Sequence, residues 1–271
     1  MRQVVHRSGL SFGLLVLALP APARAQSAAA PSIYAASLAE ANTGTEEIST
    51  AELQRLLAGG NVVLLDTRPH LEWAISHIPG ALNVAPKPGM PMSLYTSDAA
   101  EVGRLVGGDR TRPLVLYCNG PFCGKSRRMA EELLAAGHTN VRRYQLGAPV
   151  WRALGGIMVI APEGVRHVAA HDGTAVWLDA RDAAEFQAGS LPGAKHLPES
   201  GLRPGKDQGE VKAAKDDGRL PMHDHNTRII VFGRNAANAR AVADALAKEA
   251  FHNTAYFDGD FRAIQAALAD R

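Results

Sequence analysis

The stretch VVLLDTRPHLEWAISHIPGALNVAP, residues 62–86, decides the fold because the chain carries a second version of it. It aligns without a gap on AVWLDARDAAEFQAGSLPGAKHLPE, residues 175–199, and eight of the 25 positions are identical. The identical positions fall on markers of a strand, a turn and a helix, and they are Val63/Val176, Leu65/Leu178, Asp66/Asp179, Arg68/Arg181, Glu72/Glu185, Pro79/Pro192, Gly80/Gly193 and Ala81/Ala194. Internal similarity of this kind predicts a duplicated domain.

Each copy continues in the same order after the repeated stretch. An apolar, β-rich run follows, LVLYC (114–118) or IIVFG (229–233), and then a helical pattern, a short strand and a closing helix. The helical patterns place apolar residues on one face, namely Met129, Leu133 and Ala136 in the first copy and Val242, Leu246 and Ala250 in the second. Strands alternating with helices predict an α/β fold in which each domain is a mostly parallel sheet flanked by helices. We expect the two domains at residues 46–160 and 161–271.

Two local signals refine this outline. Ser49 and Glu52 form a capping-box pattern that predicts the start of a helix in the first copy. Residues 200–220 are a charged, glycine-containing insertion of the second copy, and we expect them to form a solvated loop.

The amino-terminal segment is typical of a secretory signal peptide. Arg2 and Arg7 precede a short apolar run at residues 10–19, and Ala23-Arg24-Ala25 supplies a cleavage pattern of small residues. We therefore expect residues 1–25 to be a signal peptide, residues 26–45 a flexible lead-in, and the mature protein to be periplasmic or secreted. The apolar run is too short to span a bilayer, so we expect no membrane span after the signal is removed.

The charge balance gives no reason to expect nucleic acid as a partner. Residues 1–25 hold three of the 29 Lys and Arg residues and no acid, so the remainder has 26 basic against 27 acidic residues. A nucleic-acid-binding protein would carry an excess of positive charge on one face or arm.

Cys118 and Cys123 are the two cysteines of the chain. Two cysteines in one loop cannot hold together a chain of this size, so we expect them to have a chemical role. Cys118 ends an apolar strand run, and parallel sheets place their ligands at the carboxyl ends of the strands. For Cys123 three readings stay open: a resolving thiol, a disulfide partner of Cys118, or a plain loop residue.

The repeated pattern resembles the rhodanese family. Asp66-Thr-Arg68, Glu72-Trp73 and His77-Ile-Pro-Gly-Ala81 look like that family's D-x-R, E-aromatic and H-I-P-G-A signature, and Val115-Leu-Tyr-Cys118 follows at the expected distance. The second copy matches through Asp179-Ala-Arg181, Glu185-Phe186 and Leu191-Pro-Gly-Ala194. The resemblance covers residues 46–271.

The resemblance implies a sulfurtransferase in which Cys118 is the catalytic nucleophile and carries sulfur as a persulfide. The sulfur would come from thiosulfate or a similar small anionic donor and pass to cyanide or a thiol. The cradle of the sulfur, and so the substrate-binding loop, would be formed by Asn119, Gly120, Pro121, Phe122, Cys123, Gly124 and Lys125. A helix amino terminus after Cys118 would lower the pKa of its thiol and supply N–H donors for an anion.

The loop departs from the common family pattern. The family places a helix-opening serine six residues after the cysteine, whereas Ser126 comes eight residues after Cys118. The loop CNGPFCGKS also carries a second thiol, which resembles a subset of the family with C-x-G-P-x-C loops. The second copy has Gly233 in place of the cysteine and cannot form a persulfide, so we expect the second domain to be a structural or substrate-shaping partner.

Several polar residues have a structural interpretation. The pairs Asp66/Arg68 and Asp179/Arg181 occur in both copies, including the one without a thiol, and this favours ion pairs that hold a loop. His77 is expected at a turn or helix cap because the second copy has Ser190 there. His223-Asp224-His225 lacks further ligands, so we expect neither a metal nor another cofactor.

Two other functions compete with sulfur transfer. A thiol–disulfide redox protein would use the Cys118/Cys123 pair, and a non-catalytic binding module would keep the fold and lose the chemistry. A phosphatase or arsenate reductase needs an arginine to close the loop on its anion. Gly124 and Lys125 stand there instead, which disfavours that class.

Overall fold

The computed structural model describes residues 44–85, 99–121 and 123–269. The expected signal peptide and almost all of the expected lead-in lie outside these residues, as does Phe122 of the cysteine loop.

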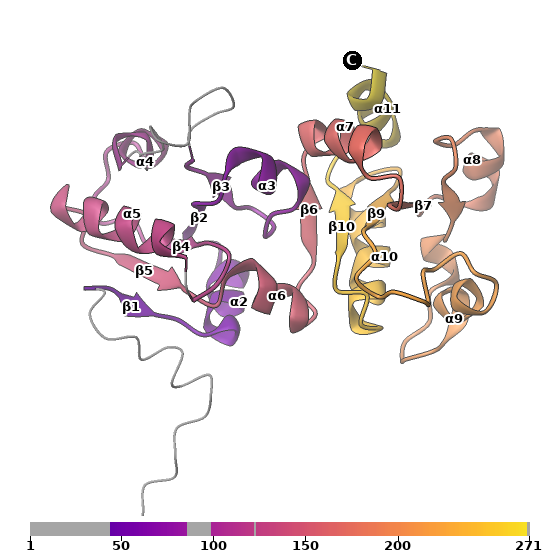
Figure 1. Cartoon of the computed structure of the whole chain (residues 1–271), viewed down its shortest axis with the longest axis horizontal. Coiled ribbons are helices and arrows are strands. Elements are labelled where there is room, and N and C mark those ends of the chain that lie inside the picture. Colours follow the sequence, from indigo (N-terminus) through magenta and orange to yellow (C-terminus); the bar gives the residue numbers. More distant parts are fainter. Residues whose placement is uncertain (1–43, 86–98, 122, 270–271) are drawn as a thin grey trace, which may run out of the picture.

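Two five-stranded parallel sheets form the framework (Figure 1). The first sheet has the order β1-β5-β4-β2-β3, and its strands are β1 (Glu46–Glu47), β2 (Val63–Asp66), β3 (Leu82–Asn83), β4 (Leu114–Tyr117) and β5 (Val141–Tyr144). The second has the order β6-β10-β9-β7-β8, with β6 (Met158–Ile160), β7 (Val176–Asp179), β8 (Lys195–His196), β9 (Ile229–Phe232) and β10 (Thr254–Phe257). The two orders correspond strand by strand, which confirms the duplicated α/β fold.

Helices cover both sheets. Those connected with the first sheet are α2 (Thr50–Gly59), α3 (His70–Ile75), α4 (Ala99–Leu105), α5 (Gly124–Ala135) and α6 (Gly147–Ala153). Those connected with the second are α7 (Pro162–His171), α8 (Ala183–Ala188), the 3₁₀ turn η2 (Glu199–Gly201), α9 (Gly209–Asp216), α10 (Ala236–Lys248) and α11 (Phe261–Ala269).

The apolar strands form these sheets because both of their faces are buried. Leu116 of β4 packs with Met129 and Leu133 of α5 on one face. On the other face Tyr117 packs with Leu53 of α2. The helix α2 begins where the sequence predicted, since the Ser49 side chain accepts a hydrogen bond from the Glu52 amide at 3.1 Å. These contacts hold the carboxyl end of β4 in the middle of the first domain.

The helices α5 and α10 end in the same left-handed turn, made by different residues. Gly137 follows α5 with a φ of 89°, a conformation that glycine adopts without steric cost. In the second domain Ala250 takes this place with a φ of 67°. The second domain therefore keeps the same helix end, although the side chain of Ala250 is unfavourable in this conformation.

The prediction of a solvated loop at residues 200–220 is wrong. The segment contains η2 and the helix α9, whose Val211 and Ala214 are buried against the second core. The ammonium of Lys215 lies 2.6 Å from the Glu249 carboxylate and 2.7 Å from that of Asp207. Two apolar residues on one helical face, with this bridging lysine beside them, anchor the segment.

The two domains share a packed seam between α3 and α7. His77 and Val159 exchange two backbone hydrogen bonds of 2.9 and 2.8 Å, and the Ala161 amide donates to the Ala74 carbonyl at 2.8 Å. Gly164 of α7 packs against the backbone of Ala74. The strand β6 (Met158–Ile160) belongs to the second sheet. That sheet therefore begins a few residues before residue 161, the first residue that the sequence analysis assigned to the second domain.

None of the helices in the described part of the chain has the length and apolar character needed to cross a membrane.

Candidate active site

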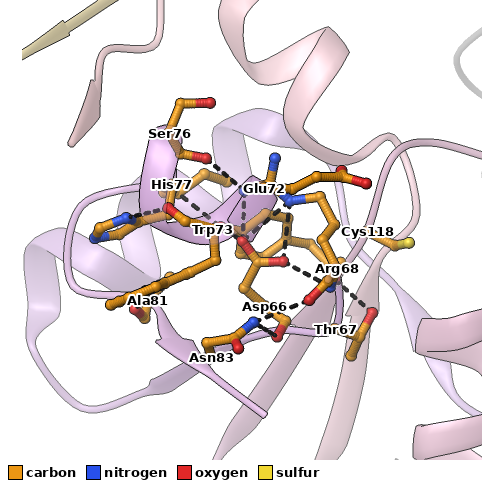
Figure 2. A network of polar contacts seen from close by, with 12 residues as sticks. Asp66, Thr67, Arg68, Glu72, Trp73, Ser76, His77, Ala81, Asn83 and Cys118 are labelled. Carbon is orange, nitrogen blue, oxygen red and sulfur yellow. Dashed lines mark hydrogen bonds and ion pairs between the residues drawn. The ribbon is translucent and has the colours of Figure 1, made fainter. Parts of the chain in front are cut away.

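A buried ion pair organises the loop between β2 and α3 (Figure 2). The Asp66 carboxylate accepts from Arg68 Nε at 3.0 Å, from Arg68 Nη2 at 2.5 Å and from the Arg68 backbone amide at 2.9 Å. Arg68 Nη2 also donates to the Ser76 carbonyl at 2.6 Å. Burial opposes the charge of Arg68, but Asp66 outweighs it and holds the pKa of Arg68 above its ordinary value. The pair fastens the two ends of α3 to the sheet, so its expected structural role is confirmed.

The second domain repeats this ion pair, but a different residue supplies the hydroxyl group that donates to the aspartate. Arg181 binds Asp179 and the Gly189 carbonyl in the same geometry. In the first domain Tyr117 Oη is a further donor to the aspartate, whereas Phe232 at the equivalent end of β9 has no hydroxyl. Ser190 Oγ donates to Asp179 at 2.7 Å instead. Each aspartate is therefore bound by an arginine and a hydroxyl group.

His77 occupies the position of Ser190 and has the capping role expected from the sequence. Its Nδ1 lies 2.8 Å from the carbonyl oxygen of Trp73 near the end of α3, and its ring stacks on that of Trp73. Burial lowers the pKa of His77 below the usual range of histidine. The neutral ring thus closes the helix beside the domain seam.

Cys118 directly follows the central strand β4, at the carboxyl end of the strands, as the sequence predicted. Its sulfur points away from the Asp66–Arg68 pair (Figure 2). It forms a disulfide with Cys123, whose Cα atom lies 6.1 Å away, within the range that a disulfide bridges. Of the three interpretations of Cys123, the structure agrees with the one in which it is the disulfide partner of Cys118. Cys118 is 2% exposed, and because its sulfur is bonded to that of Cys123, this oxidised form does not contain the free thiolate expected from the sequence.

The loop that carries the disulfide is held by contacts at both ends. Asn119 Nδ2 donates to the Glu72 carboxylate at 2.6 Å, and the Cys123 amide donates to the Gly120 carbonyl at 3.0 Å. Cys123 then caps α5, whose first amides lack partners within the helix and point toward the loop. These features provide the positive helix end that the sequence predicted.

The turn into α6 contacts the backbone of the same loop. The Ala148 amide donates to the Cys118 carbonyl at 3.0 Å. A Cβ atom on Gly147 would lie 2.3 Å from that carbonyl oxygen and 2.6 Å from the Gly120 nitrogen. Only glycine permits this approach, and Gly147 also has a φ of 66°.

The equivalent loop of the second domain is filled by a side chain. Asn238 Oδ1 accepts from the Arg234 amide, and Asn238 Nδ2 donates to the Ala180 carbonyl and to Glu199. A Cβ atom on Gly233 would lie 2.3 Å from Asn238 Oδ1. This loop therefore has neither a thiol nor the space for one.

A family model, the rhodanese-like domain, matches residues 49–154 and 167–267, which is most of the chain and one match for each sheet. The chain belongs to the rhodanese-like domain family. The resemblance noted in the sequence is thereby confirmed for both copies.

Relatives of this rhodanese-like chain differ in what their names state. An HTH-type transcriptional regulator, Rv0324 of Mycobacterium tuberculosis, is 34% identical over 110 residues, which are 41% of this chain and 43% of that protein. The chain thus spans less than half the length of this curated relative.

Two of the solved structures similar to the chain share low sequence identity with it. The thiosulfate sulfurtransferase of Pseudomonas aeruginosa is 22% identical, with a TM-score of 0.36, over 83% of this chain and 46% of that one. The 3-mercaptopyruvate sulfotransferase SseA of Escherichia coli is 22% identical, with a TM-score of 0.34, over 79% of this chain and 98% of that one.

The structure gathers most of the predicted residues of this rhodanese-like loop and adds others. Asn119, Gly120, Pro121, Cys123, Gly124 and Lys125 follow Cys118 between β4 and the first turn of α5. Gly147 and Gln145 were not predicted, because they lie after β5, which pairs with β4 although the two strands are far apart in the sequence. The described residues contain no group of three metal-ligating side chains.

Proposed function

We propose that the chain is a sulfurtransferase whose first domain transfers sulfur through a Cys118 persulfide. The observation that carries the proposal is the position of Cys118, at the end of a central strand and before the amino terminus of α5. A helix amino terminus stabilises an adjacent thiolate, and the thiolate is the form that attacks a sulfur donor.

The proposed cycle has two displacement steps. The Cys118 thiolate attacks the outer sulfur of thiosulfate, forms an S–S bond and releases sulfite with the electron pair of the bond that breaks. Cyanide or a thiolate then attacks the outer sulfur of the persulfide and regenerates the Cys118 thiolate. In the first case the product is thiocyanate and no oxidant is consumed. Backbone amides of the loop and the helix end would hold the anionic donor.

The disulfide makes this cycle dependent on prior reduction. Cys118 is almost fully buried, whereas Cys123 is half-buried, so an external thiol has better access to the Cys123 sulfur. Attack there forms a mixed disulfide on Cys123 and releases Cys118 as the thiolate. A second thiol then frees Cys123 and leaves as the oxidised disulfide.

A second candidate, thiol–disulfide exchange, is favoured by the disulfide itself. In that function Cys118 and Cys123 would pass their disulfide to a dithiol partner and be reoxidised. An exported location, which we propose from residues 1–25, would suit either function, because disulfides persist in oxidising compartments.

The assay that tests sulfur transfer measures thiocyanate formed from thiosulfate and cyanide by the full mature chain. The oxidised protein should be inactive, and protein reduced with dithiothreitol and then freed of it should be active. Cys123→Ser should be active without reduction and Cys118→Ser inactive in either state. If both the reduced protein and Cys123→Ser form no thiocyanate, transfer from thiosulfate is excluded. If the reduced two-cysteine chain then reduces a disulfide-bonded substrate and Cys123→Ser does not, the exchange function is favoured.

A further inference from the structure

Gln145 carries a buried side-chain amide whose hydrogen-bonding capacity is unused. The residue is 1% exposed, and neither its Oε1 nor its Nε2 has a hydrogen-bond partner in the structure. A buried amide left without partners destabilises a fold, and each such group in a native protein calls for an explanation. The network around Asp66 and the capping of the neighbouring helices do not involve it.

The register of the sheet places Gln145 beside Cys118. Tyr117 of β4 and Tyr144 of β5 are paired in the parallel ladder, so the residues after them leave the sheet side by side. Both tyrosines belong to the core cluster that includes Leu53 of α2. Cys118 and Gln145 directly follow these two strands, and continuing the alternation of side chains by one residue directs both toward the opposite face, where α5 lies.

The turn after Gln145 confirms that this part of the chain lies against the cysteine loop. The hydrogen bond from Ala148 to the Cys118 carbonyl and the close approach of Gly147 both come from this turn. In the second domain the position after β10 is Asp258, which is exposed, and the strand-end residue beside it is Gly233. A buried amide thus accompanies the strand-end cysteine and is missing where the cysteine is missing.

We infer that Gln145 Nε2 donates a hydrogen bond to the Cys118 sulfur once the disulfide has been reduced. Two external thiols supply the electrons for that reduction and leave as one disulfide. Of their two protons one goes to Cys123 and the other to solvent, and Cys118 is released as the thiolate. A disulfide sulfur is a weak acceptor, whereas a thiolate carries a full charge and accepts a charge-assisted hydrogen bond. Gln145 is therefore a positioning residue that stabilises the reduced, ionised form of Cys118.

Two measurable consequences follow from this selective stabilisation. The amide lowers the pH at which the Cys118 thiol ionises, and it shifts the exchange equilibrium with an external thiol toward the dithiol protein. The role of this thiolate in sulfur transfer rests on the proposed function, but its ionisation and its redox equilibrium can be measured without turnover.

The test compares Gln145→Met with Gln54→Met, a matched change at an exposed position of α2. In the Cys123→Ser background, thiolate absorbance is followed against pH. Gln145→Met should raise the ionisation midpoint by about one pH unit, which corresponds to a tenfold weaker preference for the thiolate. In the two-cysteine chain, the equilibrium constant for reduction by glutathione should fall by about the same factor. Gln54→Met should change neither.

A second variant guards against misfolding of the first. Gln145→Glu keeps a polar side chain of the same length but places a carboxylate near the thiolate, so it should raise the midpoint further than Gln145→Met. The oxidised Gln145→Met protein should melt no lower than the parent, since it loses an amide without partners. Midpoints of both Gln145 variants equal to that of Gln54→Met would overturn the inference.

The outcomes separate this inference from the proposed function. If the reduced parent forms no thiocyanate while Gln145→Met raises the midpoint, sulfur transfer fails and the amide–thiolate bond stands. If the parent turns over thiosulfate and Gln145→Met leaves the ionisation midpoint unchanged, sulfur transfer stands and the amide–thiolate bond is excluded.

Discussion

Tyr117 donates a hydrogen bond from its phenolic oxygen to the Asp66 carboxylate at a distance of 2.5 Å, with both side chains fully buried. Tyr117 Oη also accepts from the Ile78 amide at 3.1 Å, so the tyrosine connects the end of β4 to the loop after α3. Burial raises the pKa of Tyr117 well above its ordinary value, which keeps the hydroxyl protonated as a donor.

Removal of the Tyr117 hydroxyl should cost more than removal of a hydroxyl with a neutral partner. Tyr117→Phe leaves a buried carboxylate with one donor fewer, and we expect a loss of about 2 kcal/mol in the free energy of unfolding. Tyr144→Phe is the control, because Tyr144 Oη is bonded to the neutral Thr50 hydroxyl, and about 1 kcal/mol is expected there. Urea unfolding of the oxidised chains measures both, and equal losses would contradict this account of Asp66.

The stability of the chain should depend on pH through His77. Burial depresses the pKa of His77 in the folded state, while the unfolded chain takes up the proton near the ordinary value. The unfolded state thus binds more protons below about pH 6.5, and stability is lost as the pH falls toward and through the folded pKa. Melting curves between pH 7 and pH 5 should show a steeper loss for the parent than for His77→Gln. Parallel curves would rule out this contribution.

The domain seam should depend on the absence of a side chain at Gly164. A Cβ atom there would lie 2.0 Å from the Ala74 carbonyl oxygen, so Gly164→Ala must displace α7 from α3. We expect a loss of about 3 kcal/mol in the free energy of unfolding and faster proteolysis between the domains. Gly173→Ala is the matched control, since a Cβ atom at Gly173 meets nothing within 4 Å. If the two variants behave alike, α3 and α7 are not tightly packed.

Ala250→Gly should stabilise the protein. Ala250 has a φ of 67°, which is unfavourable for a residue with a Cβ atom, and the equivalent helix end in the first domain has Gly137. Relief of this strain should add about 1 kcal/mol to the free energy of unfolding. The converse change, Gly137→Ala, should reduce it. Thermal melts of both variants test the sign, and a loss of stability in Ala250→Gly would refute the assignment.

Gly147→Ala should disable the cysteine loop. The added methyl group would overlap the backbone of Cys118 and Gly120, so the loop must move away from the end of β4. In the reduced chain we expect alkylation of Cys118 at neutral pH to change at least tenfold, because a misplaced loop alters both the access to the sulfur and its ionisation. Gly103→Ala in α4, where a Cβ atom meets nothing, serves as the control. Identical alkylation rates in the two variants would show that the loop does not depend on Gly147.

The sequence predicted the parts of the fold that are repeated. The D-x-R pattern in both copies indicated the ion pairs of Asp66 and Asp179, and the strand runs indicated β4 and β9. Residues 200–220 were assigned wrongly because Val211 and Ala214 are too few to mark a helix among charged neighbours. Their burial becomes apparent only when α9 is seen against the second core.

By itself the sequence determined that the chain holds two similar domains and that Cys118 ends a strand in one of them. The first follows from the similarity of two segments of the chain, and the second from local patterns, since periodicity and turn residues act over a few positions. The tertiary structure decided that Cys118 is bonded to Cys123, that Ser190 replaces the hydroxyl of Tyr117, and that the turn after β5 lies against the backbone of Cys118. These relationships depend on loop geometry and on strand order and register, and a periodic pattern in one segment does not specify which segment will lie next to it.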